Sequence, residues 1–111
     1  MSYQVRHEGQ YTVVALDGEV DLHRSPEARK QILDQLKKKA HVLVDLSAVK
    51  YIDSSGVAVL VEGYQTAKTQ QLEFGLVGVS PAAMQVLQLA RLDKVFPIHD
   101  SVEDRVNARQ E

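Results

Sequence analysis

The segment Asp53-Ser54-Ser55-Gly56 places a carboxylate, two hydroxyls and a glycine in four consecutive residues. Serine and aspartate side chains take part in hydrolytic sites. They also start helices, because their oxygens accept hydrogen bonds from the free amides of the first turn. Glycine permits a tight turn and lets another molecule approach the backbone closely. The residues alone leave two interpretations open: a functional loop, or a helix start in which Ser54 or Ser55 is the cap.

Catalysis and metal binding find little support elsewhere in the chain. His23 follows Asp21, and together with a serine they would supply a Ser-His-Asp triad, but the sequence identifies no oxyanion arrangement. Cysteine is absent, and no glycine-rich loop with a lysine is present to hold a nucleotide. The histidines show no ligand spacing and are interpreted as surface or packing residues: His7, His23, His41 and His99. We expect a protein that is not an enzyme and binds neither metal nor cofactor.

The size and charge of the chain indicate one domain that works with other proteins. Its 111 residues suit a single domain over positions 1–111, and a formal net charge of −2 provides no basic surface for nucleic acid. No stretch approaches the roughly 20 apolar residues that span a bilayer. Residues 1–6 do not resemble a signal peptide, and the lack of cysteine agrees with a reducing compartment. We therefore expect a cytoplasmic protein without membrane insertion.

Hydrophobic patterning predicts strands and helices in alternation. The strands are expected at residues 3–8, 11–17, 42–46, 74–79 and 95–98. The helices are expected from residue 25 to the lysines at 37–39, from 53–56 to about 70, from 80 and from 100. This order favours an α/β fold with about four helices and a mixed sheet of about five strands. An N-terminal antiparallel hairpin precedes parallel crossover units.

Particular side chains are expected to start the helices and to form their buried sides. Ser25 and Ser80, each followed by proline, are predicted N-caps. Asp100 with Glu103 resembles a capping box. Apolar residues at helical spacing predict the buried stripe of the second helix, namely Val57, Leu60, Val61 and Tyr64.

Residues 46–58, Leu-Ser-Ala-Val-Lys-Tyr-Ile-Asp-Ser-Ser-Gly-Val-Ala, resemble the signature of the STAS domain family, specifically of the bacterial anti-sigma-factor antagonists (anti-anti-sigma factors). In that family a strand ending in Asp-Leu is followed by an aromatic or apolar pair and then by Asp-Ser-Ser/Thr-Gly. Residues 16–21, Leu-Asp-Gly-Glu-Val-Asp, resemble a second signature, and residues 76–81 and 89–96 are also similar. The resemblance runs nearly end to end, in the right order, and implies the STAS fold.

What the resemblance implies is regulation of transcription by partner switching. In this family the unphosphorylated antagonist binds an anti-sigma factor, which is a serine kinase with a histidine-kinase-like ATP fold, and so frees a sigma factor. The kinase phosphorylates the first serine of the motif, here Ser54, and the phosphoprotein dissociates. A metal-dependent serine phosphatase resets it. The surroundings of the phosphosite that are expected to take part in partner binding are Asp53, Ser55, Gly56, Asp21 and Glu19.

The resemblance also implies an alternative from a different class of protein. Similar STAS domains serve as the cytoplasmic accessory subunit of a lipid-transport ABC complex, where they bind the transporter ATPase. The serine motif is often degraded in those subunits, so the intact residues 53–56 favour the regulatory role. The two roles differ in gene neighbourhood: a serine kinase and phosphatase accompany the regulator, whereas a permease and an ATPase accompany the transport subunit.

Overall fold

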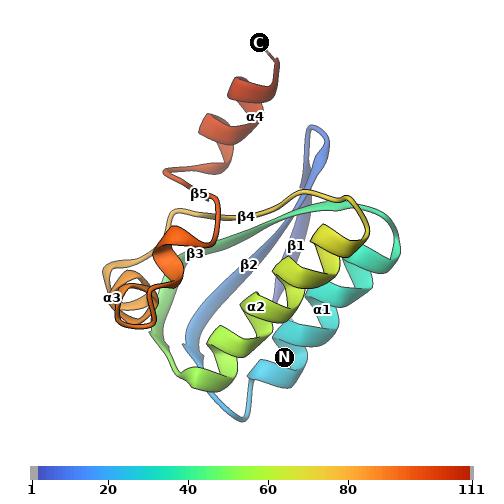
Figure 1. Cartoon of the computed structure of the whole chain (residues 1–111). Coiled ribbons are helices and arrows are strands. Elements are labelled where there is room, and N and C mark those ends of the chain that lie inside the picture. Colours follow the sequence, from blue (N-terminus) through green and yellow to red (C-terminus); the bar gives the residue numbers. More distant parts are fainter. Residues whose placement is uncertain (1–2, 111) are drawn as a thin grey trace.

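A five-stranded mixed sheet forms the centre of the computed structural model, which describes residues 3–110. The first two strands are antiparallel, and the remaining three run parallel to the second. The sheet order follows the chain order (Figure 1): β1 (Gln4–Glu8), β2 (Tyr11–Val20), β3 (His41–Ile52), β4 (Phe74–Val77) and β5 (Ile98–His99). The predicted mixed α/β fold with its N-terminal hairpin is thereby confirmed.

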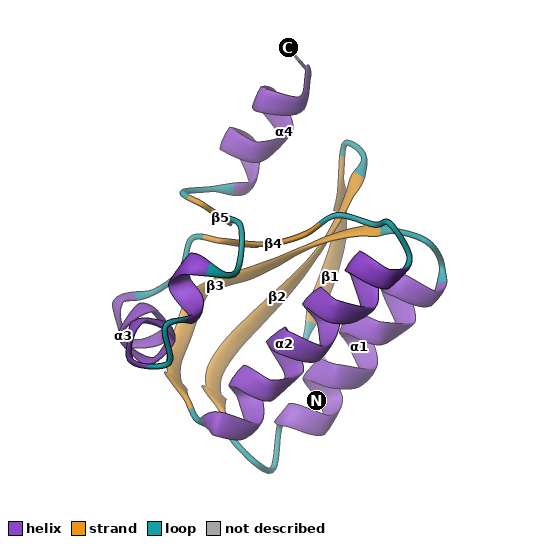
Figure 2. Cartoon of the chain, viewed as in Figure 1, coloured by secondary structure: helices purple, strands orange, loops and turns teal. Residues whose placement is uncertain are grey.

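Four helices connect or follow the strands, and a short 3₁₀ helix, η1 (Leu92–Lys94), precedes β5 (Figure 2). The α-helices are α1 (Ser25–Lys37), α2 (Ser54–Thr69), α3 (Pro81–Leu89) and α4 (Val102–Gln110). In Figure 1, α1 and α2 lie side by side across the sheet, with α3 at one end. Among the described residues, no helix combines the length and the apolar character that crossing a membrane requires.

The two faces of the sheet carry separate cores because successive side chains of a strand point in opposite directions. In β3, Val42, Val44 and Leu46 face α1, α2 and α3, and all three are fully buried. Leu43, between them, packs in the smaller core on the opposite face, where Val102 of α4 covers it. The continuous apolar run at residues 42–46 therefore reflects a strand that is covered on both sides.

Strands β2 and β3 are longer than the pattern predicts: β2 continues to Val20 and β3 to Ile52. The added segments pair with each other, and two register shifts interrupt the ladder before Glu19 pairs with Tyr51 and Val20 with Ile52. Exposed residues in the second half of β3 break the apolar run, so this part has the sequence pattern of a loop. Both strands consequently end together, directly before the loop at Asp53.

The start of α1 differs from the prediction that Ser25 is its N-cap. Arg24 occupies the cap position without a side-chain cap bond, and Ser25 is buried in the first turn. The carboxylate of Asp21 instead accepts hydrogen bonds from the amides of His23 and Arg24, at 3.0 and 3.1 Å. An acidic side chain four residues earlier thus organises the turn from β2 into α1.

The later helix starts give one confirmation and one correction. The hydroxyl of Ser80 accepts a hydrogen bond from the amide of Ala83 at 3.2 Å, as its predicted role as N-cap requires. Helix α4, however, begins at Val102, and the hydroxyl of Ser101 accepts from the amide of Asp104 at 3.1 Å. The predicted capping box of Asp100 with Glu103 is therefore wrong by one residue, because Ser101 is the side chain next to the first turn.

Candidate functional site

The first turn of α2 lies against the ends of β2 and β3. The backbone amide of Asp53 approaches the carbonyl oxygen of Val20 at 3.4 Å. A β-carbon on Gly56 would lie 2.7 Å from that same oxygen and 2.7 Å from Cγ1 of Ile52. The close approach that Gly56 permits is thus made by the chain's own backbone. This glycine seats the start of α2 on the sheet.

Asp53 is the N-cap of α2, which corrects the expectation that Ser54 or Ser55 caps the helix. Its Oδ1 accepts hydrogen bonds from the amides of Ser55 and Gly56, at 2.9 and 3.2 Å, and from the Ser55 hydroxyl at 2.5 Å. The Ser55 hydroxyl makes the largest contribution to lowering the pKa of Asp53. The amides of Gly56, Ser55 and Leu22 lower this pKa further, although partial burial acts in the opposite direction. Asp53 is therefore a fixed negative charge at neutral pH.

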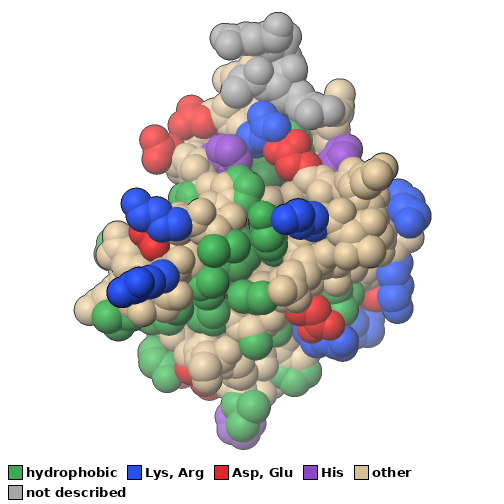
Figure 3. Space-filling view, viewed as in Figure 1, with side chains coloured by type: hydrophobic (Ala, Val, Ile, Leu, Met, Phe, Trp, Pro, Cys, Tyr) green, Lys and Arg blue, Asp and Glu red, His purple; other side chains and the backbone are tan. Residues whose placement is uncertain are grey.

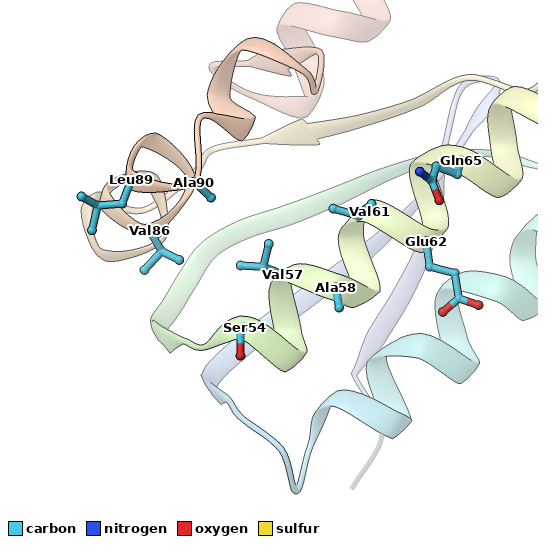
Figure 4. Close-up of a pocket in the computed structure, with 9 residues that line it drawn as sticks. All are labelled: Ser54, Val57, Ala58, Val61, Glu62, Gln65, Val86, Leu89 and Ala90. Atoms are coloured by element: carbon cyan, nitrogen blue, oxygen red, sulfur yellow. The ribbon is translucent and has the colours of Figure 1, made fainter.

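The two serines of the motif have different environments. The Ser55 side chain is partly buried, and its hydroxyl is committed to Asp53. Ser54 is exposed, and among the side chains of residues 3–107 no hydrogen bond engages its hydroxyl. As Figure 4 shows, Ser54 stands at the start of α2 with its hydroxyl directed outward. Of the two hydroxyls, only that of Ser54 is free to react with an incoming protein.

The acidic residues expected around the motif are only partly brought together. Asp21 lies in the loop beside the start of α2, because both of its chain neighbours reach Asp53. The carbonyl oxygen of Val20 accepts from the amide of Asp53, and the amide of Leu22 lowers the pKa of the Asp53 carboxyl. Glu19 is different. Because Val20 packs into the core beneath the helices, the preceding residue points to the opposite face of the sheet. Asp21 therefore belongs to the Ser54 surface, whereas the Glu19 side chain does not.

An apolar groove runs from Ser54 along the side of α2 that faces α3, and we call it the Ser54 groove. It encloses about 660 Å³ and is open to solvent (Figures 3 and 4). Its lining residues are Ser54, Val57, Ala58, Val61, Glu62, Gln65, Val86, Leu89 and Ala90. Leu89, on the rim, has 81% of its surface exposed. Such a cluster of exposed apolar side chains on a small domain is typical of a protein-binding surface.

The groove includes residues that were predicted to be buried. Of the predicted stripe, only Leu60 is fully enclosed, whereas Val57, Val61 and Tyr64 are partly exposed along the groove side of α2. A sequence signal for this arrangement exists: residues 57–61 are five consecutive apolar residues. Because a helix resting on a sheet buries only one side, such a run must also place apolar side chains outside the core.

The histidines have packing or surface positions. Nδ1 of His41 accepts a hydrogen bond from the amide of Glu73 at 2.9 Å, and Nδ1 of His7 lies 3.2 Å from the hydroxyl of Thr12. His23 is exposed in the loop after β2 and makes no side-chain hydrogen bond to a described serine. Among the side chains that the structure describes, those of residues 3–107, no group of histidine, aspartate and glutamate could hold a metal ion.

Replacing Asp53 by alanine should lower the melting temperature by several degrees, because two amides and the Ser55 hydroxyl lose their acceptor. Asp53→Asn is the matched control, since asparagine is an equally good N-cap and should keep most of the stability. The lowered pKa of Asp53 sets the pH dependence. The ionised carboxylate of Asp53 contributes its full stabilisation above the pKa that Asp53 has in the unfolded chain. This contribution is lost as the pH falls through the lower pKa of the folded protein.

Acid denaturation of wild type and Asp53→Asn checks this dependence. The difference in unfolding free energy between the two proteins should be constant near neutral pH and should change only in strongly acidic solution. Equal melting temperatures for wild type and Asp53→Ala would contradict the capping role.

Comparison with known proteins gives a consistent result over nearly the whole chain. The model of the STAS domain family matches residues 2–105. An anti-sigma F factor antagonist of Paenibacillus polymyxa is 27% identical over 113 residues, covering 100% of this chain and 94% of the relative. An anti-sigma-B factor antagonist of Listeria monocytogenes is 28% identical over 91 residues, covering 81% of this chain and 79% of the relative.

Solved structures agree with the sequence comparisons. An anti-sigma factor antagonist from Mycobacterium paratuberculosis is 27% identical, with a TM-score of 0.84 and coverage of 99% of this chain and 94% of that chain. A STAS domain protein from Planctomyces limnophilus is also 27% identical, with a TM-score of 0.85 and complete coverage of both chains. The unphosphorylated form of the antagonist SpoIIAA, at 20% identity and a TM-score of 0.82, shares the fold over 98% of this chain and 96% of its own. The chain belongs to the STAS domain family.

Proposed function

We propose that this chain is an anti-sigma-factor antagonist that acts by binding and not by catalysis. Its unphosphorylated form binds an anti-sigma factor with serine kinase activity, and phosphorylation of Ser54 ends the binding. The exposed, unbonded hydroxyl of Ser54 at the end of an apolar groove is the observation that carries the proposal. Relatives named as antagonists that align with most or all of this chain support it.

The Ser54 groove offers the contact area that a kinase would need near its phosphoacceptor. Protein interfaces combine an apolar centre with a polar rim, and exposed side chains such as Leu89 provide apolar area that only a partner can bury. Because Ser54 itself lines the groove, a protein docked there brings its own surface against the hydroxyl. Binding and modification therefore use one surface, as a partner switch requires.

A phosphoryl group on Ser54 would meet few free hydrogen-bond donors in its own helix. Asp53 already accepts from the amides of Ser55 and Gly56, which are the usual anion-binding groups of a helix start. A charge of about −1.5 to −2 would then lie beside the Asp53 carboxylate and face the partner. The expected effect is electrostatic repulsion at the docking surface with little change in the fold.

Other proteins complete the proposed cycle. A serine phosphatase removes the phosphoryl group, and all three proteins act in the cytoplasm. Neither nucleic acid nor membrane insertion has a part in the proposal. Titration of the unphosphorylated protein with a purified anti-sigma kinase from the same organism tests the first step. An absence of binding together with tight binding to an ABC transporter ATPase would replace this proposal by the transport role.

We expect the kinase to phosphorylate Ser54 and not Ser55, because the Ser55 hydroxyl donates a hydrogen bond to Asp53 at 2.5 Å and is partly buried. Phosphopeptide mass spectrometry after incubation with kinase and ATP identifies the modified serine. Ser54→Ala should abolish labelling, and the control Ser55→Ala should retain it. The reverse pattern, with label kept in Ser54→Ala and lost in Ser55→Ala, would overturn the assignment.

A further inference from the structure

The Ser54 groove continues along α2 into a second cavity, which we call the Lys68 cavity. The second cavity encloses about 290 Å³ and shares Val61 and Gln65 with the first, so the two form one extended groove. Tyr64, Lys68, Leu92, Val95 and Phe96 complete its lining. From Ser54 to Lys68 the helix rises about 21 Å at 1.5 Å per residue. The extended groove is therefore as long as about four turns of an α-helix laid beside α2.

Basic residues lie in and next to the lining of the Lys68 cavity: Lys68 lines it, and Arg91 and Lys94 directly precede the lining residues Leu92 and Val95 in the chain. We call these three cations the basic rim. Lys68, Arg91 and Lys94 are exposed, and in the described part of the chain none of the three side chains forms an ion pair or a hydrogen bond. Asp93 lies between Arg91 and Lys94 in the sequence, so this region carries three positive side chains and one negative side chain. Figure 3 shows hydrophobic side chains exposed between lysine and arginine side chains on this face of the molecule.

The charges at the other end of the groove are different. Glu62, which lines the Ser54 groove, is held by Arg29 through two hydrogen bonds of 2.7 and 2.8 Å, so its charge is already paired. The Ser54 end carries the fixed negative charge of Asp53. The extended groove thus has an acidic end at the phosphoacceptor and a basic end at Lys68. An occupant that lies along it must have the opposite polarity.

We propose that the extended groove receives an amphipathic helix of the anti-sigma kinase, whose apolar side fills the groove and whose acidic residues meet Lys68 and Lys94. This inference rests on the proposed function and adds the chemistry by which the partner is selected. A small apolar ligand inside the groove would leave Leu89 and Val95 in water, at 81% and 46% exposure. A helix with its own protein behind it buries both.

The basic rim then distinguishes between related kinases. Unpaired cations at the edge of an interface attract a partner with acidic residues and repel one with basic residues at the same place. They also raise the association rate, and both effects weaken with added salt. Apolar contacts along Val57, Val61 and Leu89 would be common to many partners. Lys68 and Lys94 would set which of them binds.

The double variant Lys68→Glu/Lys94→Glu tests this inference by calorimetric titration with the anti-sigma kinase. We expect the Kd to rise at least about tenfold at low ionic strength, since two attractive contacts become repulsive. The difference should shrink as salt is added. The matched control is Lys37→Glu/Lys38→Glu, which makes the same charge change on exposed lysines at the end of α1. The control should bind like wild type.

Three outcomes would overturn the inference, and each leaves a different conclusion. If the unaltered protein binds the kinase and Lys68→Glu/Lys94→Glu binds it equally well, the acidic helix is ruled out and the proposed function is kept. If oleate binds saturably, and Leu89→Ala abolishes this binding without changing the affinity for the kinase, the groove is a site for an acyl chain. A wild-type dimer in sedimentation that Leu89→Ala converts to monomer assigns it to a second copy. Failure of the unaltered protein to bind the kinase counts instead against the proposed function.

Discussion

Ser54→Asp should weaken binding to the anti-sigma kinase by about 100-fold or more, while its melting temperature stays within a few degrees of wild type. In the free protein, a negative charge in the first turn of α2 gains about 0.3–1 kcal/mol from the helix dipole. Repulsion from the nearby Asp53 carboxylate is of similar size in solvent. In the complex the balance is lost, because like charges at an interface cost several kcal/mol, and every 1.4 kcal/mol is a factor of ten in Kd.

The control variants isolate the charge from the loss of the hydroxyl. Ser54→Asn has nearly the shape of the aspartate variant without its charge and should bind much more tightly than Ser54→Asp. Ser54→Ala should bind constitutively at little cost in stability, because Asp53 and not Ser54 caps the helix. Calorimetric titration and thermal melting, applied to all three, decide the matter. Tight binding by Ser54→Asp, or lost binding in an unfolded variant, would refute a switch based on repulsion.

Gly56→Ala should have the largest effect on stability, a loss of about 1–3 kcal/mol. The new β-carbon would lie 2.7 Å from the carbonyl oxygen of Val20, which is backbone in the sheet and cannot rotate away. This clash outweighs the gain of about 0.5–1 kcal/mol that replacing a helical glycine by alanine normally brings. For a domain of this size the melting temperature should fall by roughly 4–8 °C per kcal/mol.

Thermal melting of Gly56→Ala and Ser54→Ala compares the stability cost of a new β-carbon with that of losing a hydroxyl, within the same helical turn. Ser54→Ala adds no atom against the sheet and should melt close to wild type. Displacement of the first turn should also slow phosphorylation of Ser54 in Gly56→Ala, because the hydroxyl moves with the backbone. A Gly56→Ala protein as stable as wild type would mean that α2 does not rest on Val20 as closely as the structure indicates.

The local signals in the sequence were sufficient to predict the sheet, the hairpin and the position of the serine motif, but not that small residues form the centre of the buried side of α2. The structure buries the small residues Gly56, Gly63 and Ala67 together with Val59 and Leu60. At Gly63 a β-carbon would lie 2.8 Å from Cε2 of Phe74, so the helix sits unusually close to its neighbours there.

Reasoning from large apolar residues therefore identified only part of the buried side: Leu60 lies in the core, whereas Val57, Val61 and Tyr64 pack against the core and stay partly exposed. Hydrophobicity marks Val57, Val61 and Tyr64 as fully buried, yet with the small residues of α2 at the centre of the contact these three lie at the edge of the core, beside the groove. The length of β3 escaped prediction for a related reason. Its second half pairs with a strand about 30 residues away through two irregular steps, and no local pattern encodes that pairing. Packing between distant segments decides both features.

Helix α4 covers the face of the sheet opposite to the one that carries α1, α2 and α3. In Figure 1 the chain leaves α4 at the far side of the molecule from the start of α2. A fluorophore, an affinity tag or another folded module attached after α4 would therefore leave the Ser54 end of the extended groove open. The end of α4 and the proposed docking surface at Ser54 thus lie on different sides of the domain, and this separation would let the proposed switch operate with a module attached there.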